Sequence, residues 1–214
     1  MASLIPFAVQ AGCACPPHAE LALALAAEFR DVDVDGADAG LDALAARIGD
    51  VGELSPGEQL DVCAAAVATD LAPAGPTWGS DDLFLDVGLQ ERRGHPAVLA
   101  AICVEAGRRA GVPLGIVATR GRWLVAHPQL DEDRLVDPRR GRALRASALA
   151  SEPTWRCAHQ LSLALLDELC ARARTTGDLM RAIRATELRL ALPLDARGLS
   201  RQRDELGALR ARLN

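Results

Sequence analysis

The side chains that could do chemistry are concentrated in residues 92–141, which include His95, Cys103, His127 and Asp137. A thiolate, an imidazole base and a carboxylate that orients the base are the groups used in thiol-dependent acyl transfer. The thiol is best activated in the first turn of a helix, where the helix dipole and a nearby imidazole stabilise the thiolate. The groups for such chemistry are therefore present, and their positions decide whether they could work together.

A helix followed by short strands is predicted to position these groups. Pro96 suits the first position of a helix, because its missing N–H is not needed there. Apolar residues then recur at helical spacing until Gly111 and Pro113 end the helix. Three strands are predicted next, at 114–118, 122–127 and 134–136. A buried helix and an antiparallel meander, within a chain of mostly helical pattern, predict an α+β fold.

Four motifs in this order resemble the SirB1 family of the transglutaminase-like superfamily. They are Arg92-Arg93-Gly94-His95-Pro96, Gly111-Val112-Pro113, Gly121-Arg122-Trp123-Leu124 and Asp137-Pro138. Members carry R-R-G-x-P, G-[LIV]-P, a G-H-F-L-like strand and D-P at these places. The resemblance covers roughly residues 81–144 and implies a papain-like core with a small antiparallel sheet. In the superfamily, such a core places a Cys at the helix N-terminus, a His on the following strand and an Asp or Asn on the next.

The resemblance implies a member that lacks the catalytic groups. The helix start, residues 95–97, has no thiol, as tends to be true of SirB1-like proteins. The position implied for the His holds Arg122, which stays protonated at pH 7 and cannot act as a base. Only Asp137 keeps its type. We therefore expect a remnant site, formed by His95, Pro96, Arg122 and Asp137, without a competent nucleophile.

The former cleft is expected to bind a peptide or protein partner instead. The residues expected to contact it are Arg122, Trp123, His95 and Arg93. The guanidinium of Arg122 is a planar fork that suits a carboxylate. Because a partly buried carboxylate is costly without a partner, we also expect Arg122 to pair with Asp137.

Three other groups are candidates for a rearranged active site. Cys103 lies about two turns inside the helix and is expected to be buried and inert. His127 is an odd number of positions from Arg122, so strand alternation places their side chains on opposite faces, and we expect a surface or strand-end His. His95 could face the former site, although capping or packing at the helix start is the simpler role.

Composition limits the classes of partner and cofactor. The 214 residues have a net charge of −5, which predicts no binding of nucleic acid, although 139–145 form a local Arg cluster expected to be a solvated turn. No Cys-x-x-Cys pair is present, so no metal or other cofactor is predicted. No apolar stretch is long enough to span a membrane. Cys63, Cys103 and Cys170 have apolar helical neighbours and indicate reduced thiols in a cytoplasmic bacterial protein.

Helical patterns surround the central stretch, and they suggest three parts: a helical 1–80, a transglutaminase-like core at 81–148 and a helical, tetratricopeptide-like 149–214. Residues 1–16 are expected to be extended. The acidic segment 31–40 resembles the start of a calcium loop, but its twelfth position is Asp42 rather than Glu, so we favour a loop with a helix-capping Asp. A helix is expected over 155–173.

Three functions remain open. The first is non-catalytic binding through the former cleft. The second is a hydrolase or transferase that uses His95 and Asp137 without a cysteine. The third is a structural adaptor that acts through the C-terminal helices.

Overall fold

The computed structural model describes residues 4–73, 78–130 and 133–213 of the chain. By their contacts the described residues form two compact units, one of residues 32–157 and one of residues 4–31 with 158–213. This grouping differs from the three parts suggested by the sequence motifs, because the N-terminal helices belong with the C-terminal ones.

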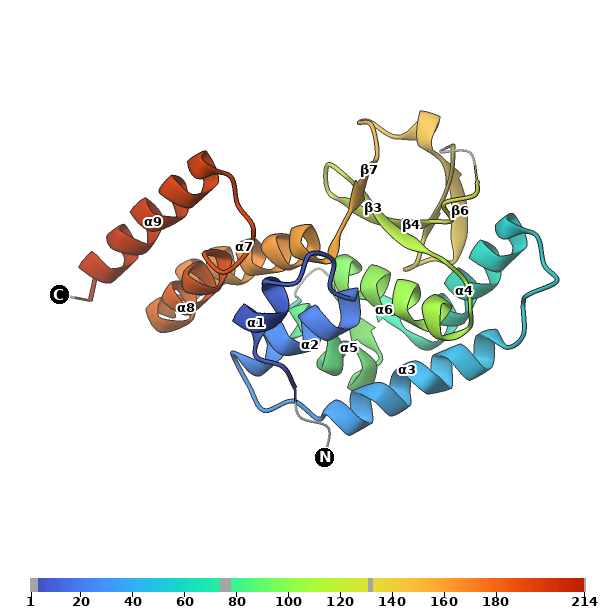
Figure 1. Cartoon of the computed structure of the whole chain (residues 1–214), viewed down its shortest axis with the longest axis horizontal. Helices are drawn as coiled ribbons and strands as arrows, with labels where there is room; N and C mark the ends of the chain where they lie inside the picture. Colours follow the sequence, from blue (N-terminus) through green and yellow to red (C-terminus); the bar gives the residue numbers. More distant parts are fainter. Residues whose placement is uncertain (1–3, 74–77, 131–132, 214) are drawn as a thin grey trace. The chain divides into compact units, whose positions relative to one another are not determined.

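The first unit is built around helix α6 (Pro96–Arg109), whose residues 97–107 are all buried (Figure 1). As predicted, Pro96 takes the first helical position and Gly111 follows the last turn with a φ of +80°. Three helices contact α6: α3 (Val34–Ile48), α4 (Pro56–Asp70) and α5 (Leu85–Gln90). A 3-10 turn, η1 (Asp81–Leu83), leads into α5, where one continuous helix was expected.

A five-stranded antiparallel sheet lies against this helical layer, with the strand order β6-β5-β4-β3-β7. Its strands are β3 (Gly115–Thr119), β4 (Arg122–Ala126), β5 (Arg134–Asp137), β6 (Arg142–Arg145) and β7 (Thr154–Arg156). Two residues of β1 (Ala72–Pro73) also pair in parallel with β2 (Arg93–Gly94). A short 3-10 turn, η2 (Ala146–Ala148), follows β6. The predicted α+β class is confirmed, but the sheet has two strands beyond the predicted three.

The two strands that sequence reasoning missed are both edge strands. β6 is almost wholly exposed and lacks the apolar alternation by which a strand is recognised. β7 falls where a helix was expected to begin at residue 155, and helix α7 (Ala158–Thr176) starts only afterwards. The large side chain of Trp155 lies over Gly115 on β3, where an added Cβ would come within 2.6 Å of the indole. Gly115 therefore leaves the space that Trp155 occupies.

Two segments that were expected to be non-helical contain helix. Residues 34–40 of the acidic segment expected to be a loop belong to α3. The expected helix-capping Asp is present, since Asp33 accepts a hydrogen bond from the Gly36 N–H at 2.9 Å. Among the described residues, no three His, Cys, Asp or Glu side chains are grouped as metal ligands would be. The leader expected to be extended contains helix α1 (Phe7–Ala11), with Phe7 fully buried.

The second unit consists of α1 and α2 (His18–Ala27) together with α7, α8 (Leu179–Arg189) and α9 (Ala196–Ala211). Helix α7 contacts both α2 and α8, and α8 contacts α9. Of the helices that the structure describes, none combines the length and apolar character needed to cross a bilayer.

Candidate functional site

The N-terminus of α6 is closed by His95. Its Nδ1 accepts a hydrogen bond from the backbone N–H of Ala97 at 3.3 Å, and its own backbone N–H donates to the Asp82 carbonyl at 2.8 Å. An imidazole that accepts through Nδ1 is neutral and carries its proton on Nε2. The ring also lies 4.8 Å from the Trp78 ring, centroid to centroid, at a tilt of 54°. The lone pair that a general base needs is thus used to cap the helix.

A buried carboxylate that sequence reasoning missed lies beside this helix start. Asp82 is only 2% exposed, and its Oδ2 accepts a hydrogen bond from the Gly79 N–H at 2.6 Å. Its Oδ1 accepts no hydrogen bond from the residues that the structure describes, although the Nε of Arg93 lies 3.7 Å away as an ion pair. Arg93, one of the predicted binding residues, is itself about half exposed. The sequence signals an acidic turn at 81–82 but not which carboxylate is buried.

Cys103 lies inside α6 as predicted, with no exposed surface. Burial raises the pKa of its thiol strongly, and the nearby Cys63 raises it further. Burial likewise raises the pKa of Cys63 to about 11. Both thiols are free and, at neutral pH, fully protonated, so neither is a nucleophile.

Replacing Cys103 by Ala is expected to lower the free energy of unfolding by about 1–2 kcal/mol, because it leaves a small cavity in the core. Urea denaturation measures this change. As a control, Cys15→Ala at an exposed thiol should change stability by less than about 0.5 kcal/mol. A Cys103→Ala variant as stable as the control would contradict tight packing around the sulfur.

Asp137 does not pair with Arg122, and this prediction is wrong. Its carboxylate, 2% exposed, is held by Arg139: Nε donates to Oδ1 at 2.9 Å and Nη2 to Oδ2 at 2.6 Å. The Arg139 backbone N–H donates to Oδ1 as well, at 3.0 Å. Arg122 is exposed at the start of β4 and makes no ion pair with any described residue. The partner two positions away in the chain forms this contact within the turn and leaves Arg122 free to face solvent.

The bound Arg139 changes the acidity of Asp137. Burial acts to raise the pKa of this carboxyl, but the hydrogen bonds from Arg139 and the charges of Arg139 and Arg140 together lower it below its ordinary value. A lowered pKa in the folded state stabilises the fold above the unfolded-state pKa of about 3.9. That stabilisation is lost progressively from about pH 5 down through the lowered pKa.

Replacing Asp137 by Asn is therefore expected to lower stability at pH 7 by about 1–2 kcal/mol, since a charge-assisted pair is lost. Stability measured between pH 7 and pH 3 should fall less steeply for this variant than for the wild type. The exposed Asp61, which pairs with Arg134, provides the control: Asp61→Asn should change stability by less than about 1 kcal/mol. Identical pH profiles for wild type and Asp137→Asn would contradict the assignment.

The pairing of β4 with β5 places Arg122 and Asp137 at the same end of the sheet. Val125 of β4 pairs with Val136 of β5, so Asp137 stands opposite Leu124, two positions from Arg122. Strand alternation puts Arg122 on the same face as Leu124, which belongs to the apolar cluster of that face. Trp123 is partly buried on the other face. The structure thus keeps Arg122 and Asp137 near each other without joining them.

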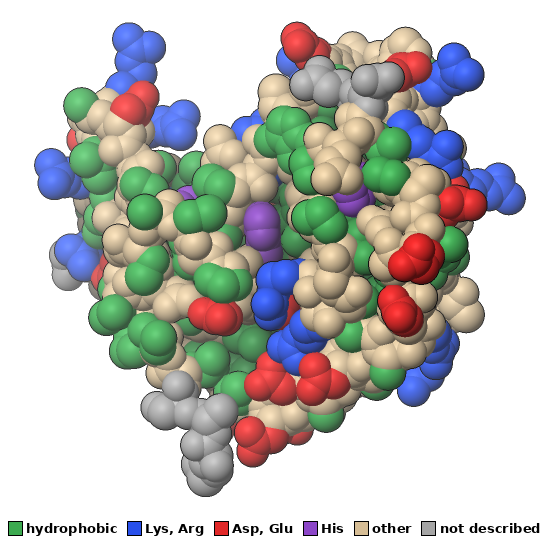
Figure 2. All heavy atoms as spheres, turned by 45° about the vertical axis from the view of Figure 1, so that its right-hand side comes forward, with side chains coloured by type: hydrophobic (Ala, Val, Ile, Leu, Met, Phe, Trp, Pro, Cys, Tyr) green, Lys and Arg blue, Asp and Glu red, His purple; other side chains and the backbone are tan. Residues whose placement is uncertain are grey.

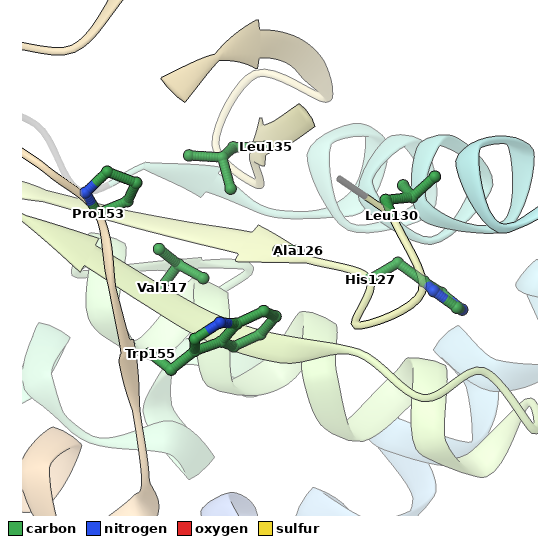
Figure 3. Close-up of a pocket in the computed structure, with 7 residues that line it drawn as sticks. All are labelled: Val117, Ala126, His127, Leu130, Leu135, Pro153 and Trp155. Atoms are coloured by element: carbon green, nitrogen blue, oxygen red, sulfur yellow. The ribbon is translucent and has the colours of Figure 1, made fainter. Parts of the chain in front are cut away.

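His127 is strand-terminal as predicted, but it is buried rather than on the surface, with 1% exposed. Its Nδ1 accepts a hydrogen bond from the Gln129 N–H at 3.2 Å, and burial lowers its pKa. A small apolar pocket adjoins it, lined also by Val117, Ala126, Leu130, Leu135, Pro153 and Trp155. Figure 3 shows the imidazole turned away from Val117 and Trp155. His127 therefore does not offer a base to this pocket.

A buried helix packed on a small antiparallel sheet fits a transglutaminase-like core. The family model described as the transglutaminase-like superfamily matches residues 38–184, more than half of the chain, and the chain belongs to this superfamily. A similar curated protein is the UPF0162 protein PA3419 of Pseudomonas aeruginosa, with 43% identity over 61 residues. That match covers 28% of this chain and only 22% of the relative. No solved structure matches the chain.

Proposed function

We propose that this protein is a non-catalytic, SirB1-like member of the transglutaminase-like superfamily that binds a peptide or protein partner through its former active-site cleft. The observation that carries the proposal is the start of α6, where His95, Pro96 and Ala97 stand and no thiol is present. The thiol farther inside the helix, Cys103, is fully buried. Thiol-dependent acyl transfer has no nucleophile in this arrangement.

The remaining polar groups favour binding over a cysteine-independent reaction. The Nδ1 of His95 accepts the hydrogen bond that caps α6, and both oxygens of the Asp137 carboxylate accept hydrogen bonds from Arg139. Neither group is available to take a proton from a substrate or water without breaking these contacts. By contrast, Arg122 is exposed and offers the hydrogen-bond fork that binds carboxylates. Trp123, partly buried next to it, has the large rigid side chain typical of binding hot spots.

The catalytic half of the proposal is tested with an amine-incorporation assay and with thiol labelling of the native protein. We expect no turnover of a fluorescent amine into a glutamine-containing protein. Iodoacetamide should label the exposed Cys13, Cys15 and Cys157 at the rate of ordinary thiols, and the buried thiols only after unfolding. Turnover that iodoacetamide abolishes would contradict the proposal and indicate a cysteine-dependent enzyme. Turnover that survives labelling but is lost in His95→Ala would support the rearranged site.

The binding half is tested by selecting peptides from a displayed library on the wild-type protein and measuring their affinities for variants. Arg122→Ala and Trp123→Ala should each weaken the selected peptides by roughly tenfold or more. Arg203→Ala, at an exposed position of α9, is the control and should bind as the wild type does. Peptides lost only on changes in α9 would favour an adaptor acting through the C-terminal helices. Peptides unaffected by either cleft variant would overturn the proposal.

A further inference from the structure

Strand β6 forms one edge of the five-stranded sheet, since it pairs with β5 on one side only. Arg142, Ala143 and Arg145 are exposed, and Leu144 is partly buried against the apolar cluster of the sheet. An edge strand presents unpaired backbone N–H and C=O groups along its outer side. β6 is therefore able to accept a further strand.

The sequence around this edge is rich in Arg, although the whole chain carries −5 and residues 131–145 together hold five Arg and four acidic residues. Residues 133–145 hold five Arg and two Asp. Arg139 is neutralised by Asp137, and Arg134 pairs with Asp61 on α4. For Arg140, Arg142 and Arg145, no ion pair is formed with any described acidic side chain. In Figure 2, Arg side chains lie at the upper right, with Asp and Glu side chains beside them.

A groove runs along the same edge. Its volume is about 500 Å³, and it is lined by Leu130, Asp133, Arg134, Ala143, Leu144 and Arg145. The lining thus combines apolar residues with Arg145, with Arg134, whose charge is paired with Asp61, and with the acidic Asp133. Such a mixture suits a peptide better than a bare phosphate, because both its side chains and its backbone find partners.

We propose that the β6 edge binds an acidic segment of a partner protein, which adds to the sheet as an extended strand. This inference goes beyond the proposed function, because it uses neither the start of α6 nor the Arg122–Trp123 surface. Nucleic acid is the weaker candidate, because the net negative charge opposes binding to a phosphate backbone. A second copy is also weaker, because the acidic segment at residues 31–38 is largely folded into α3.

The register of β6 specifies how the acidic residues of the partner should be spaced. Arg142 pairs with Asp137 and Arg145 pairs with Arg134, so these two Arg side chains project from opposite faces of the sheet. Partner residues that stand opposite them on an added strand are likewise three positions apart, one on each face. The preferred ligand is therefore an extended segment with two acidic residues separated by two others, and β-branched residues between them.

Fluorescence anisotropy with a labelled Thr/Val-rich peptide, carrying Asp and Glu three positions apart, tests this proposal. The double variant Arg142→Gln/Arg145→Gln should weaken binding by at least roughly tenfold, because two charge-assisted contacts are lost. The matched double variant Arg203→Gln/Arg212→Gln, at exposed positions of the C-terminal segment, should bind as the wild type does. Trp123→Ala should also leave the affinity unchanged, which separates this edge from the former cleft.

Two further peptides complete the design. A peptide in which Asn and Gln replace the Asp and Glu should lose binding if the protein recognises the carboxylates. A version N-methylated at alternate residues should lose it if backbone pairing is required. Equal binding of the neutral peptide, full binding of the N-methylated peptide or wild-type affinity in the Arg142→Gln/Arg145→Gln variant would each overturn the proposal. Tighter binding of a single-stranded oligonucleotide would overturn it as well.

Discussion

Replacing Arg189 by Ala is expected to lower the free energy of unfolding by about 3–5 kcal/mol, the largest effect predicted for a single side chain here. Arg189 is 3% exposed at the end of α8. Its Nη1 donates to Gln202 and to Glu205, each at 2.9 Å, its Nη2 donates to the Leu166 carbonyl at 3.3 Å, and its Nε lies 3.0 Å from Asp167. One guanidinium therefore joins α7, α8 and α9. Its removal leaves a cavity between the three helices, takes a donor from Gln202 and from the Leu166 carbonyl, and removes the ion pair of Asp167, while Glu205 keeps Arg174.

The control for this prediction lies one and a half turns earlier on the same helix. Arg184 pairs with Glu28 and Glu187 but is about half exposed. Arg184→Ala should therefore cost no more than about 1 kcal/mol. Urea denaturation of both variants provides the comparison. Similar losses for Arg184→Ala and Arg189→Ala would show that burial does not set the strength of the Arg189 contacts.

Replacing Gly111 by Val is expected to cost about 2–3 kcal/mol. Gly111 has a φ of +80°, and an added Cβ would meet no atom within 4 Å. The cost is thus conformational and not a clash, because β-branched residues are strongly disfavoured at positive φ. Gly111→Ala should lose about 1–2 kcal/mol, between wild type and Val. These changes are measured as shifts of the urea midpoint.

Gly207 on α9 offers the opposite case as a control. It is helical and exposed, and an added Cβ would again meet nothing within 4 Å. Gly207→Ala should stabilise the protein by about 0.5–1 kcal/mol, because Ala has the higher helix propensity. If Gly111→Val were tolerated as well as Gly207→Ala, the left-handed turn after α6 would not be required for the fold.

Features that depend on a few neighbouring residues were predictable from the sequence. Pro96 and Gly111 bound the central helix as expected, and the S-P-G-E sequence at residues 55–58 forms a capping box between Ser55 and Glu58 at the start of α4. The burial of Cys103 followed from apolar residues at helical spacing. In each case the deciding contact lies within about four residues, so the local sequence contains the relevant information.

Features that depend on contacts between distant segments were not predictable from the sequence. β6 and β7 lack a strand pattern of their own and form because β5 and β3 provide hydrogen-bonding edges for them. His127 ends a strand that is visible in the sequence, but its burial depends on elements packed around it. Arg189 is one of several similar Arg in the C-terminal helices, and only the packing of three helices buries it.

At the candidate site the two kinds of information separate clearly. The sequence alone determined that no thiol stands at the start of α6 and that Arg122 stands where the family resemblance implies a His, because residue identity settles both points. The tertiary structure decided that Arg122, on the neighbouring strand, does not reach Asp137 and leaves it to Arg139, two positions away in the same turn. Arg122 and Arg139 offer the same charge, and the turn after β5 brings the Arg139 fork to both carboxylate oxygens while Arg122 stays exposed. The choice between chemically equal partners is made by distance and direction in the folded chain, which residue types do not encode.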